Sequence, residues 1–294
     1  MTATPTVPKP AAPRGMTLVE VVVSIGVIAV LASMILPVVG AVRRSADAAV
    51  CASRLQQSGV AAGLYVSDHS GALPAFDYPR YESGEAEPIR VPGWGEVDHW
   101  VIVPFNEIVF WAYHLRPYVV DDPERDFEAA IEALCCPVPH AQWRQEVQDK
   151  ALAGHSKPVN GMWPSQKSFM KSPALFTDPH AWSDRAAPPD LNRAHAVVRA
   201  SSVRHPAAKS LLVERAAYHQ PAPVHLVEKP PAARFNALAV DGHVSVKSVE
   251  DGVAPHGFVA AGSGLEVDFV DPTEFRDTGI WLLSTHQGAH GRDW

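Results

Sequence analysis

Glu20 is the first residue whose chemistry stands out, because it is an acid at the start of a long apolar run. No charged residue occurs from Val21 to Val42, and this run exceeds the roughly 20 residues that a helix needs to cross a bilayer. A carboxylate at the bilayer centre costs about 2.5–3.5 kcal/mol, so it usually has a dedicated partner. Near a helix end it can instead reach the headgroups. The run therefore predicts a membrane-spanning helix, with either a partner or the headgroups for Glu20.

The three cysteines are the next residues that could do chemistry. They are Cys51, Cys135 and Cys136, an odd number that allows at most one internal disulfide. The neighbours Cys135 and Cys136 seldom bridge each other, because that geometry is strained. Buried free thiols are the alternative, since cysteine often packs as a small apolar residue. The residue types alone leave both states open.

Motifs for catalysis and metal binding are weak or missing. The chain has no phosphate-binding loop, no Gly-x-Ser-x-Gly elbow, no His-Glu-x-x-His helix and no Cys-x-x-Cys pair. His286 and His290 stand four residues apart, but Gln-Gly-Ala between them is poor helix. Asp241 and His243 are expected to point away from each other across a pleat. A group of acids near the end matches no familiar calcium loop: Glu266, Asp268, Asp271, Glu274 and Asp277. We expect no catalytic site, no metal and no cofactor.

Composition limits the classes of protein that the chain can belong to. It has 294 residues, of which 47% are hydrophobic and 19% charged, values of an ordinary globular protein with a sizeable core. The formal net charge of −7 argues against a nucleic-acid-binding surface. Residues 1–13 are small and rich in proline, so they are predicted to be disordered.

The apolar run is expected to continue as one long helix from Thr17 to Ser67. Pro37 and Gly40 interrupt it, so a kink or local melting is predicted there. The helix should end before Gly71. Beyond the run, one face is marked by residues at helical spacing: Cys51, Leu55, Gly59, Ala62 and Val66. The second half of the helix therefore needs a domain to cover that face.

The rest of the chain mixes loops, short helices and, near its end, strands. An aromatic-dense block spans 94–118, and its rings are expected to pack in the core rather than form a stacking platform. A short helix should run from Asp122 to Leu134. Strands are predicted at 196–200 and 210–214. Strands in this part of the chain indicate an antiparallel sheet.

A β-hairpin is the strongest signal in the last hundred residues. Segments 235–240 and 243–248 have β character, and Asp241 and Gly242 stand between them. Asp-Gly between two such segments is typical of a tight hairpin turn.

The residues around Glu20 form a motif: Gly15-Met16-Thr17-Leu18-Val19-Glu20. It resembles the processing site of type IV prepilins and of the pseudopilins of type II secretion systems. The resemblance implies that a prepilin peptidase cuts between Gly15 and Met16 and that the new terminal amine is methylated. It also implies that Glu20 meets the terminal amine of a neighbouring subunit. Met16 departs from the phenylalanine that is usual in the family.

An ordinary secretory signal peptide is the main alternative to this motif. Lys9 and Arg14 would be its basic region, Leu18 to Leu31 its apolar region and residues 30–32 its cleavage site. Glu20 would then lie inside the apolar region, and helical sequence continues past the supposed cleavage site. The prepilin motif is therefore favoured.

Further segments resemble a large bacterial subfamily of pilin-like proteins: Cys51–Gln57, Tyr65–Pro74 and Asn236–Val244, which ends in Asp-Gly-His-Val. Arg54 replaces the asparagine that is usual there, at a position of exposed type. The subfamily pairs the helix cysteine with the cysteine of a later Cys-Pro. This resemblance implies a disulfide between Cys51 and Cys136, with Cys135 as the alternative.

The resemblance implies a pilin-like α+β fold, in which one long N-terminal transmembrane helix packs on a C-terminal antiparallel β-sheet domain. We expect a leader peptide at 1–15, a transmembrane part at 16–42, the extramembrane half of the helix with its exit turn at 43–74, and a globular domain at 75–294. The globular domain would lie outside the cytoplasm, with the helix anchored in the bacterial cytoplasmic membrane.

The implied function is structural, as a subunit of a type IV pilus-like or type II secretion filament, and not enzymatic. The expected partners are the prepilin peptidase and methyltransferase, other pilin-like subunits and the lipid bilayer, and no nucleic acid. A membrane-tethered extracytoplasmic binding domain or enzyme that does not assemble into filaments is the alternative.

Overall fold

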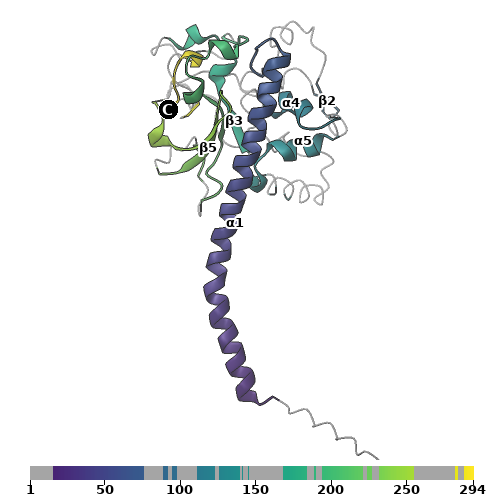
Figure 1. The fold of residues 1–294 in the computed structure, drawn as a ribbon, viewed down its shortest axis with the longest axis vertical. Coiled ribbons are helices and arrows are strands. Elements are labelled where there is room, and N and C mark those ends of the chain that lie inside the picture. The colour runs from purple at the N-terminus through teal and green to yellow at the C-terminus, as the bar shows by residue number, and fades with distance from the viewer. Residues whose placement is uncertain are drawn as a thin grey trace, which may run out of the picture. The chain divides into compact units, whose positions relative to one another are not determined.

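The structure is a computed structural model of the chain. It describes residues 16–75, 89–91, 95–97, 111–122, 126–139, 141, 145, 168–183, 189, 194–220, 224–226, 232–254, 282–283 and 288–294. The chain forms two compact units, Met1–Ser45 and Ala46–Trp294. The long helix α1, Leu18–Asp68, contributes residues to both units (Figure 1).

Helix α1 ends through its own hydrogen bonds and backbone conformation. Ser70 adopts a left-handed backbone conformation with φ 54°, and the N–H of Gly71 donates to the Val66 carbonyl at 2.8 Å. This closure over six residues is a common way to end a helix. Gly71 is also left-handed, with φ 84°, a conformation that glycine adopts without steric cost. The helix predicted from Thr17 to Ser67 is confirmed, displaced by one residue.

The helix is continuous through Pro37 and Gly40. Local melting, one of the two outcomes expected at these residues, does not occur in this structure. A proline removes one donor from the helix, and the hydrogen bonds of the neighbouring turns maintain it. The kink stays a prediction.

Four strands form the main antiparallel sheet, in the order β3-β4-β5-β6 (Figure 1). They are β3 Phe169–Lys171, β4 Ser210–Glu214, β5 Arg234–Ala239 and β6 Val244–Ser248. All residues of β3 and β4 are buried, and so are those of β5 except Arg234. The strand predicted at 210–214 is therefore confirmed. A separate antiparallel pair joins β1 Ile89–Val91 to β2 Gly95–Val97.

Strands β5 and β6 form the predicted hairpin, with Leu238 opposite Val244. The N–H of Gly242 donates to the Ala239 carbonyl at 3.0 Å, and the N–H of Ala239 donates to the His243 carbonyl at 2.9 Å. Gly242 is left-handed, with φ 90°. The connection is thus a three-residue loop that ends in a left-handed glycine, one residue longer than the predicted Asp-Gly turn.

The strand predicted at 196–200 is wrong. His195 and Arg199 make only isolated bridges, to Thr177 and Ala72 respectively, and a 3-10 helix begins at residue 200. The two bridges lead to two different segments, and among the described residues no continuous strand lies beside 196–200 to complete a ladder. The β propensity of these residues is not sufficient, because a strand also requires a neighbouring strand to pair with.

The described residues contain several shorter helices. They are α4 Ala112–Leu115, α5 Phe127–Leu134 and the 3-10 helices η2 Arg116–Tyr118, η3 Pro173–Leu175, η4 Pro179–Trp182, η5 Ala200–Ser202, η6 Pro206–Ala208, η8 Val249–Asp251 and η10 Gly288–His290. Helix α5 confirms the predicted end of the short helix at Leu134, but it begins at Phe127 rather than at Asp122.

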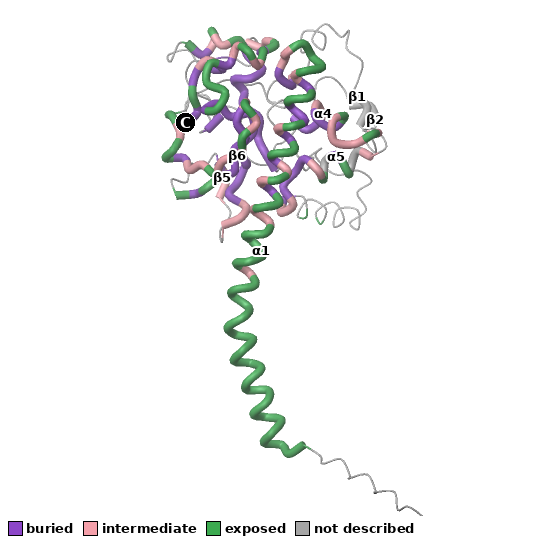
Figure 2. Tube along the Cα trace, in the orientation of Figure 1, coloured by how far each residue is buried: buried purple, intermediate pink, exposed green. Residues whose placement is uncertain are grey.

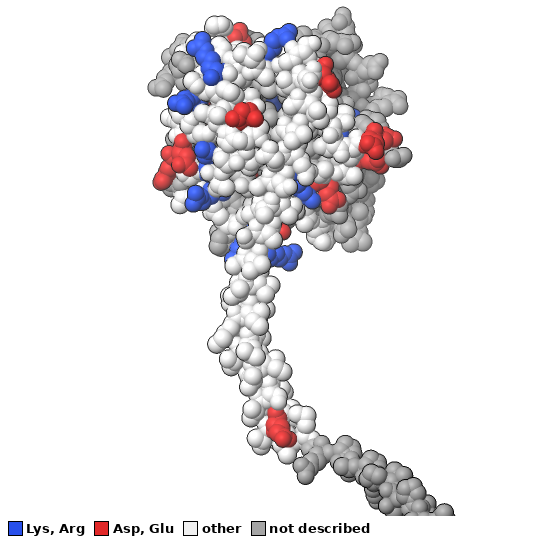
Figure 3. Space-filling model, in the orientation of Figure 1, with Lys and Arg blue, Asp and Glu red and all other residues white. Residues whose placement is uncertain are grey.

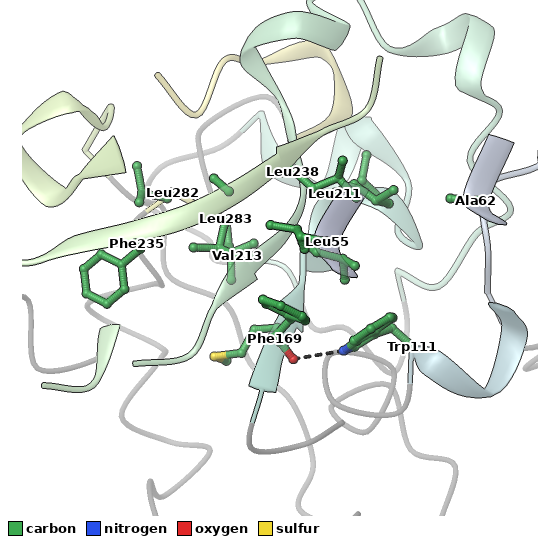
Figure 4. Packing of buried hydrophobic residues seen from close by; sticks show 14 of the residues in the cluster. Leu55, Ala62, Trp111, Phe169, Leu211, Val213, Phe235, Leu238, Leu282 and Leu283 are labelled. Carbon is green, nitrogen blue, oxygen red and sulfur yellow. Dashed lines mark hydrogen bonds between the residues drawn. The ribbon is translucent and has the colours of Figure 1, made fainter. Parts of the chain in front are cut away.

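The second half of α1 buries one face in the unit Ala46–Trp294 (Figure 2). The buried residues are Cys51, Leu55, Ser58, Ala61, Ala62 and Tyr65. Of the predicted face, Gly59 and Val66 are half-buried at its edge. Leu55 belongs to the same core cluster as Leu211 and Leu238 of the sheet (Figure 4). Burying one such leucine contributes about 1.5–3 kcal/mol, so the sheet is the partner that the apolar face requires.

Aromatic side chains complete this core. Trp111 is 1% exposed, and its Nε1 donates to the Phe169 carbonyl at 3.0 Å (Figure 4). Tyr113 and Tyr118 pack against the same cluster. These three residues behave as core aromatics, as expected for the block 94–118. The other aromatics of the block lie outside the described residues.

Candidate functional site

The first half of α1 presents an apolar surface that no described residue of its own unit covers. Every residue from Met16 to Val39 is exposed, and no Lys, Arg, Asp or Glu interrupts the segment between Glu20 and Arg43 (Figure 3). Helix α1 is long and apolar enough to cross a membrane. Water does not hold such a surface, so lipid or other apolar helices must cover it.

Glu20 caps the N-terminus of this helix, a role that was not predicted from the sequence. Its carboxylate Oε2 accepts hydrogen bonds from the N–H of Thr17 at 2.8 Å and from the Thr17 hydroxyl at 3.0 Å. The N–H of Glu20 donates to the Thr17 hydroxyl oxygen at 3.3 Å. This reciprocal pair is a capping box, which satisfies backbone donors at the helix start.

The signal for this cap was readable in the chain. Thr17-Leu18-Val19-Glu20 has the Thr-x-x-Glu spacing that marks a helix N-terminus. Glu20 therefore has a local structural role in addition to any role between subunits. Met16, at the predicted cleavage site, is exposed, and Gly15 lies outside the described residues.

A second candidate site lies in the unit Ala46–Trp294, where four possible metal ligands meet. We call it the Cys-Glu-His cluster, and it consists of Cys51, Cys136, Glu214 and His219. The donor atoms all lie within 4.8 Å of one another. They come from the second half of α1, the residues after α5, the end of β4 and the turn that follows β4.

Hydrogen bonds connect the members of this cluster. The Cys51 thiol donates to Glu214 Oε1 at 2.8 Å. His219 Nε2 lies 3.1 Å from Glu214 Oε1 and 3.5 Å from Cys136 Sγ. The carboxylate is also held by Asn236, whose backbone N–H donates to Oε2 at 2.7 Å and whose Nδ2 donates to Oε1 at 3.1 Å. The two cysteines and Glu214 are almost completely buried, so water contributes little to their solvation.

These contacts change the proton affinities of the cluster. The hydrogen bond to Cys136, burial and the Glu214 charge raise the pKa of Cys51. Burial raises the pKa of Cys136, but hydrogen bonds with Cys51 and His219 outweigh it and lower that pKa below its ordinary value. Burial lowers the pKa of His219, but hydrogen bonds with Cys136 and Glu214 outweigh it and raise that pKa. Of the three cysteines, only Cys136 has a lowered pKa.

The disulfide predicted between Cys51 and Cys136 is not formed in this structure, in which all three cysteines are free. The two sulfurs nevertheless lie within 4.8 Å of each other, so the disulfide stays a prediction. Cys135 is buried outside the cluster. The exposed position expected for Arg54 is wrong. Its side chain is 18% exposed, and its guanidinium donates to the Cys135 carbonyl at 2.8 Å.

Asp241 and His243 contact each other, so the prediction that they point apart is wrong. His243 Nδ1 lies 2.6 Å from Asp241 Oδ1, and the N–H of His243 donates to the same oxygen at 3.2 Å. The alternation of side chains applies within strands, whereas Asp241 lies in the loop before β6. Both side chains are more than a third exposed, which suits a turn better than a catalytic pair.

The remaining candidates from the sequence do not form a site among the described residues. His290 lies in η10, with its ring 6.4 Å from that of His180. His286 and the acidic group at 266–277 lie outside the described residues.

Comparison with known proteins bears on the first of the two sites. Residues 11–36 match the family model of the prokaryotic N-terminal methylation motif, a range that contains Gly15, Met16 and Glu20. No curated protein and no solved structure matched the chain. The motif points to a pilin- or pseudopilin-type protein that is processed by prepilin peptidase, and α1 indicates a single-pass membrane anchor. The α+β fold, a long N-terminal helix with an antiparallel sheet, is consistent with a pilin-like fold.

Proposed function

We propose that the chain is a structural subunit of a type IV pilus-like or type II secretion filament. In this proposal the prepilin peptidase cuts after Gly15, the terminal amine of Met16 is methylated, and the chain itself catalyses no reaction. The globular unit lies outside the cytoplasm. The observation that carries the proposal is the fully exposed apolar first half of α1 behind a methylation motif.

A filament supplies what this half of the helix lacks. Its exposed side chains are large and apolar on every side of the helix, so several copies packed together can bury them after extraction from lipid. Apolar burial is worth about 25 cal/mol per Å². A lone membrane anchor needs the same apolar length, but it does not need an acid at this depth.

In this proposal, Glu20 supplies the negative charge that pairs with a neighbouring subunit during assembly. Its carboxylate lies at the end of α1 where cleavage exposes an amine. In a low-dielectric bundle, a terminal amine of a neighbouring subunit would neutralise it, whereas an unpaired carboxylate would be costly. The capping box uses one carboxylate oxygen, Oε2, which leaves Oε1 for the neighbour.

Two substitutions at Glu20 separate capping from charge. Gln also serves at this position of a capping box, so Glu20→Gln should keep the helix start but lose the charge. We expect Glu20→Gln and Glu20→Ala both to be processed normally and to give at least about tenfold fewer filaments, a loss equivalent to about 1.4 kcal/mol. The measurement is the subunit content of sheared filaments against that of the membrane fraction.

Ser24→Ala is the matched control, because the Ser24 hydroxyl donates only to the Glu20 carbonyl of its own helix, at 2.7 Å. It should assemble like the wild type. Normal filament yield from Glu20→Gln would show that capping alone explains Glu20. A processed wild-type chain that stays in the membrane fraction and forms no self-contacts would favour a tethered binding domain instead.

A further inference from the structure

The Cys-Glu-His cluster has no part in the proposed filament function, yet its residue types are those of a metal site. Imidazole nitrogen, thiolate sulfur and carboxylate oxygen are the ligands that zinc takes in proteins, usually four in a tetrahedron. We propose that this cluster binds one zinc ion. The site would join the second half of α1 to β4 and to the segment after α5.

The separations of the donor atoms suit a tetrahedral ion. Ligand atoms bound to zinc at about 2.0–2.3 Å in a tetrahedron lie about 3.3–3.8 Å from one another. His219 Nε2 lies 3.5 Å from Cys136 Sγ, which is within this range, and 3.1 Å from Glu214 Oε1, which is slightly below it. Cys51 Sγ lies 2.8 Å from Glu214 Oε1, as an S–H donor does, and would move outward by less than about 1 Å once its proton is replaced by the ion.

Charge also favours a cation at this place. Glu214 is 1% exposed, and a buried carboxylate next to two thiols that can ionise requires a cation, which is either a protonated His219 or a bound metal ion. A divalent ion held by two thiolates and one carboxylate leaves a net charge of about −1. Asn236 then orients the carboxylate from outside through its two hydrogen bonds, as groups behind metal ligands commonly do.

The donor set selects the kind of metal. Calcium and magnesium take oxygen ligands, so two sulfurs and an imidazole exclude them. A disulfide between Cys51 and Cys136 would use the two sulfurs alone. It would leave Glu214 Oε1 and His219 Nε2, which lie within 4.8 Å of both sulfurs, with no part in the link.

Binding moves protons and no electrons. Zinc requires thiolates and a neutral ligating nitrogen, so the protons on the two thiols, and any on His219 Nε2, leave to solvent as the ion enters. His219 is the most accessible member, with its side chain 11% exposed, and marks the route of entry. A zinc ion and a Cys51–Cys136 disulfide exclude each other.

The first test uses the full-length chain, extracted in detergent from its native host without added metal, chelator or reductant. We expect about one zinc ion per chain by mass spectrometry of the metal. We also expect Cys51 and Cys136 to resist alkylation until a chelator removes the ion, and then to react as free thiols after unfolding. A Cys51–Cys136 cross-linked peptide, or absence of zinc from the folded chain, would overturn the proposal.

The second test assigns the ligands by replacing zinc with Co²⁺, whose thiolate charge-transfer absorption reports cysteine ligation. Cys136→Ser and His219→Gln should each weaken Co²⁺ binding at least about tenfold. Cys135→Ser is the matched control, because Cys135 is a buried neighbour of Cys136 outside the cluster, and it should bind as the wild type does. His219 is at the edge of the core, so its replacement should leave the chain folded. The proposed site would be contradicted if Cys135→Ser and Cys136→Ser lost the same Co²⁺ affinity, or if His219→Gln lost none.

Discussion

The two halves of α1 differ both in apolar content and in their surroundings. From Met16 to Val39 every side chain is exposed. From Cys51 to Tyr65 one face is buried against the sheet, and Cys51 and Leu55 are 0% exposed. The first half therefore depends on a partner outside the chain, whereas the second half has its partner within the chain.

The difference follows from how apolar residues are distributed around the helix. The first half is apolar on all sides, a pattern of helices in lipid or in a bundle. The second half has one apolar and one polar face, and it has a small residue, Gly59, where it meets the sheet. Small residues let the helix approach the β5–β6 hairpin closely, and Gln56 Nε2 donates to the Gly242 carbonyl there at 2.9 Å.

The same substitution placed in each half should give the largest contrast. Leu55→Ala leaves a cavity in the core and should destabilise the unit Ala46–Trp294 by about 2–5 kcal/mol. Leu31→Ala, at a residue 54% exposed, should leave the unfolding of that unit unchanged. Urea unfolding of the full chain in detergent, followed by tryptophan fluorescence, measures both. A comparable loss from Leu31→Ala would mean that the first half also packs within its own chain.

Two glycines one turn apart test the contact with the hairpin. A Cβ on Gly59 would lie 2.9 Å from Leu238 Cδ1 and 3.4 Å from the Gly242 carbonyl oxygen, whereas a Cβ on Gly63 would meet nothing within 4 Å. Gly59→Val should therefore destabilise the unit by about 1–3 kcal/mol through overpacking. Gly63→Val should be neutral or slightly stabilising, since valine is a better helix former than glycine.

The control follows from the same urea measurement. If both valine variants unfold at the same urea concentration, Gly59 is not packed against the hairpin, and the close approach of the second half to the sheet is wrong.

The hairpin loop should show a smaller effect that depends on pH. Partial burial raises the pKa of Asp241, but hydrogen bonds from the ring and backbone of His243 outweigh it and lower that pKa below its ordinary value. A lowered pKa in the folded state adds stability above about pH 4, the pKa of an unfolded Asp, and this stability is lost as the pH falls through the folded pKa. Exposure of both side chains keeps the effect small.

Asp241→Asn is the matched variant, because asparagine can keep the hydrogen bond from the His243 backbone. The wild type should unfold at a higher urea concentration than Asp241→Asn at pH 6, and the difference should shrink towards pH 3. A difference independent of pH would show that the charge of Asp241 plays no part.

Elements with strong local patterns could be predicted from the sequence. The uncharged run and its helical continuation predicted α1 to within one residue at each end, and the Asp-Gly step predicted the hairpin. The strand at 196–200 could not be judged from its residues, because a strand exists only with a neighbour and the two bridges there lead to different segments.

Sites that depend on distant residues were harder to predict. The Cys-Glu-His cluster joins Cys51 to Glu214 across 163 residues, and no spacing within the chain signals that approach. The hint available was the resemblance to a subfamily that pairs a helix cysteine with the cysteine of a later Cys-Pro, which links Cys51 to Cys136 but does not involve His219. By contrast, the Thr17–Glu20 cap depends on residues three apart, so its Thr-x-x-Glu spacing is visible in the sequence.

The proposed filament function requires that the chain is cut between Gly15 and Met16, because this cleavage would leave a free amine at the start of α1. The most direct measurement is mass-spectrometric sequencing of the N-terminal peptide of the protein isolated from its native host. The account predicts a chain that begins with N-methylated Met16, and predicts that Gly15→Val accumulates as unprocessed precursor. A chain that begins at Ser33, as a signal peptidase would leave it, or one that keeps its leader in the assembled protein, would contradict it.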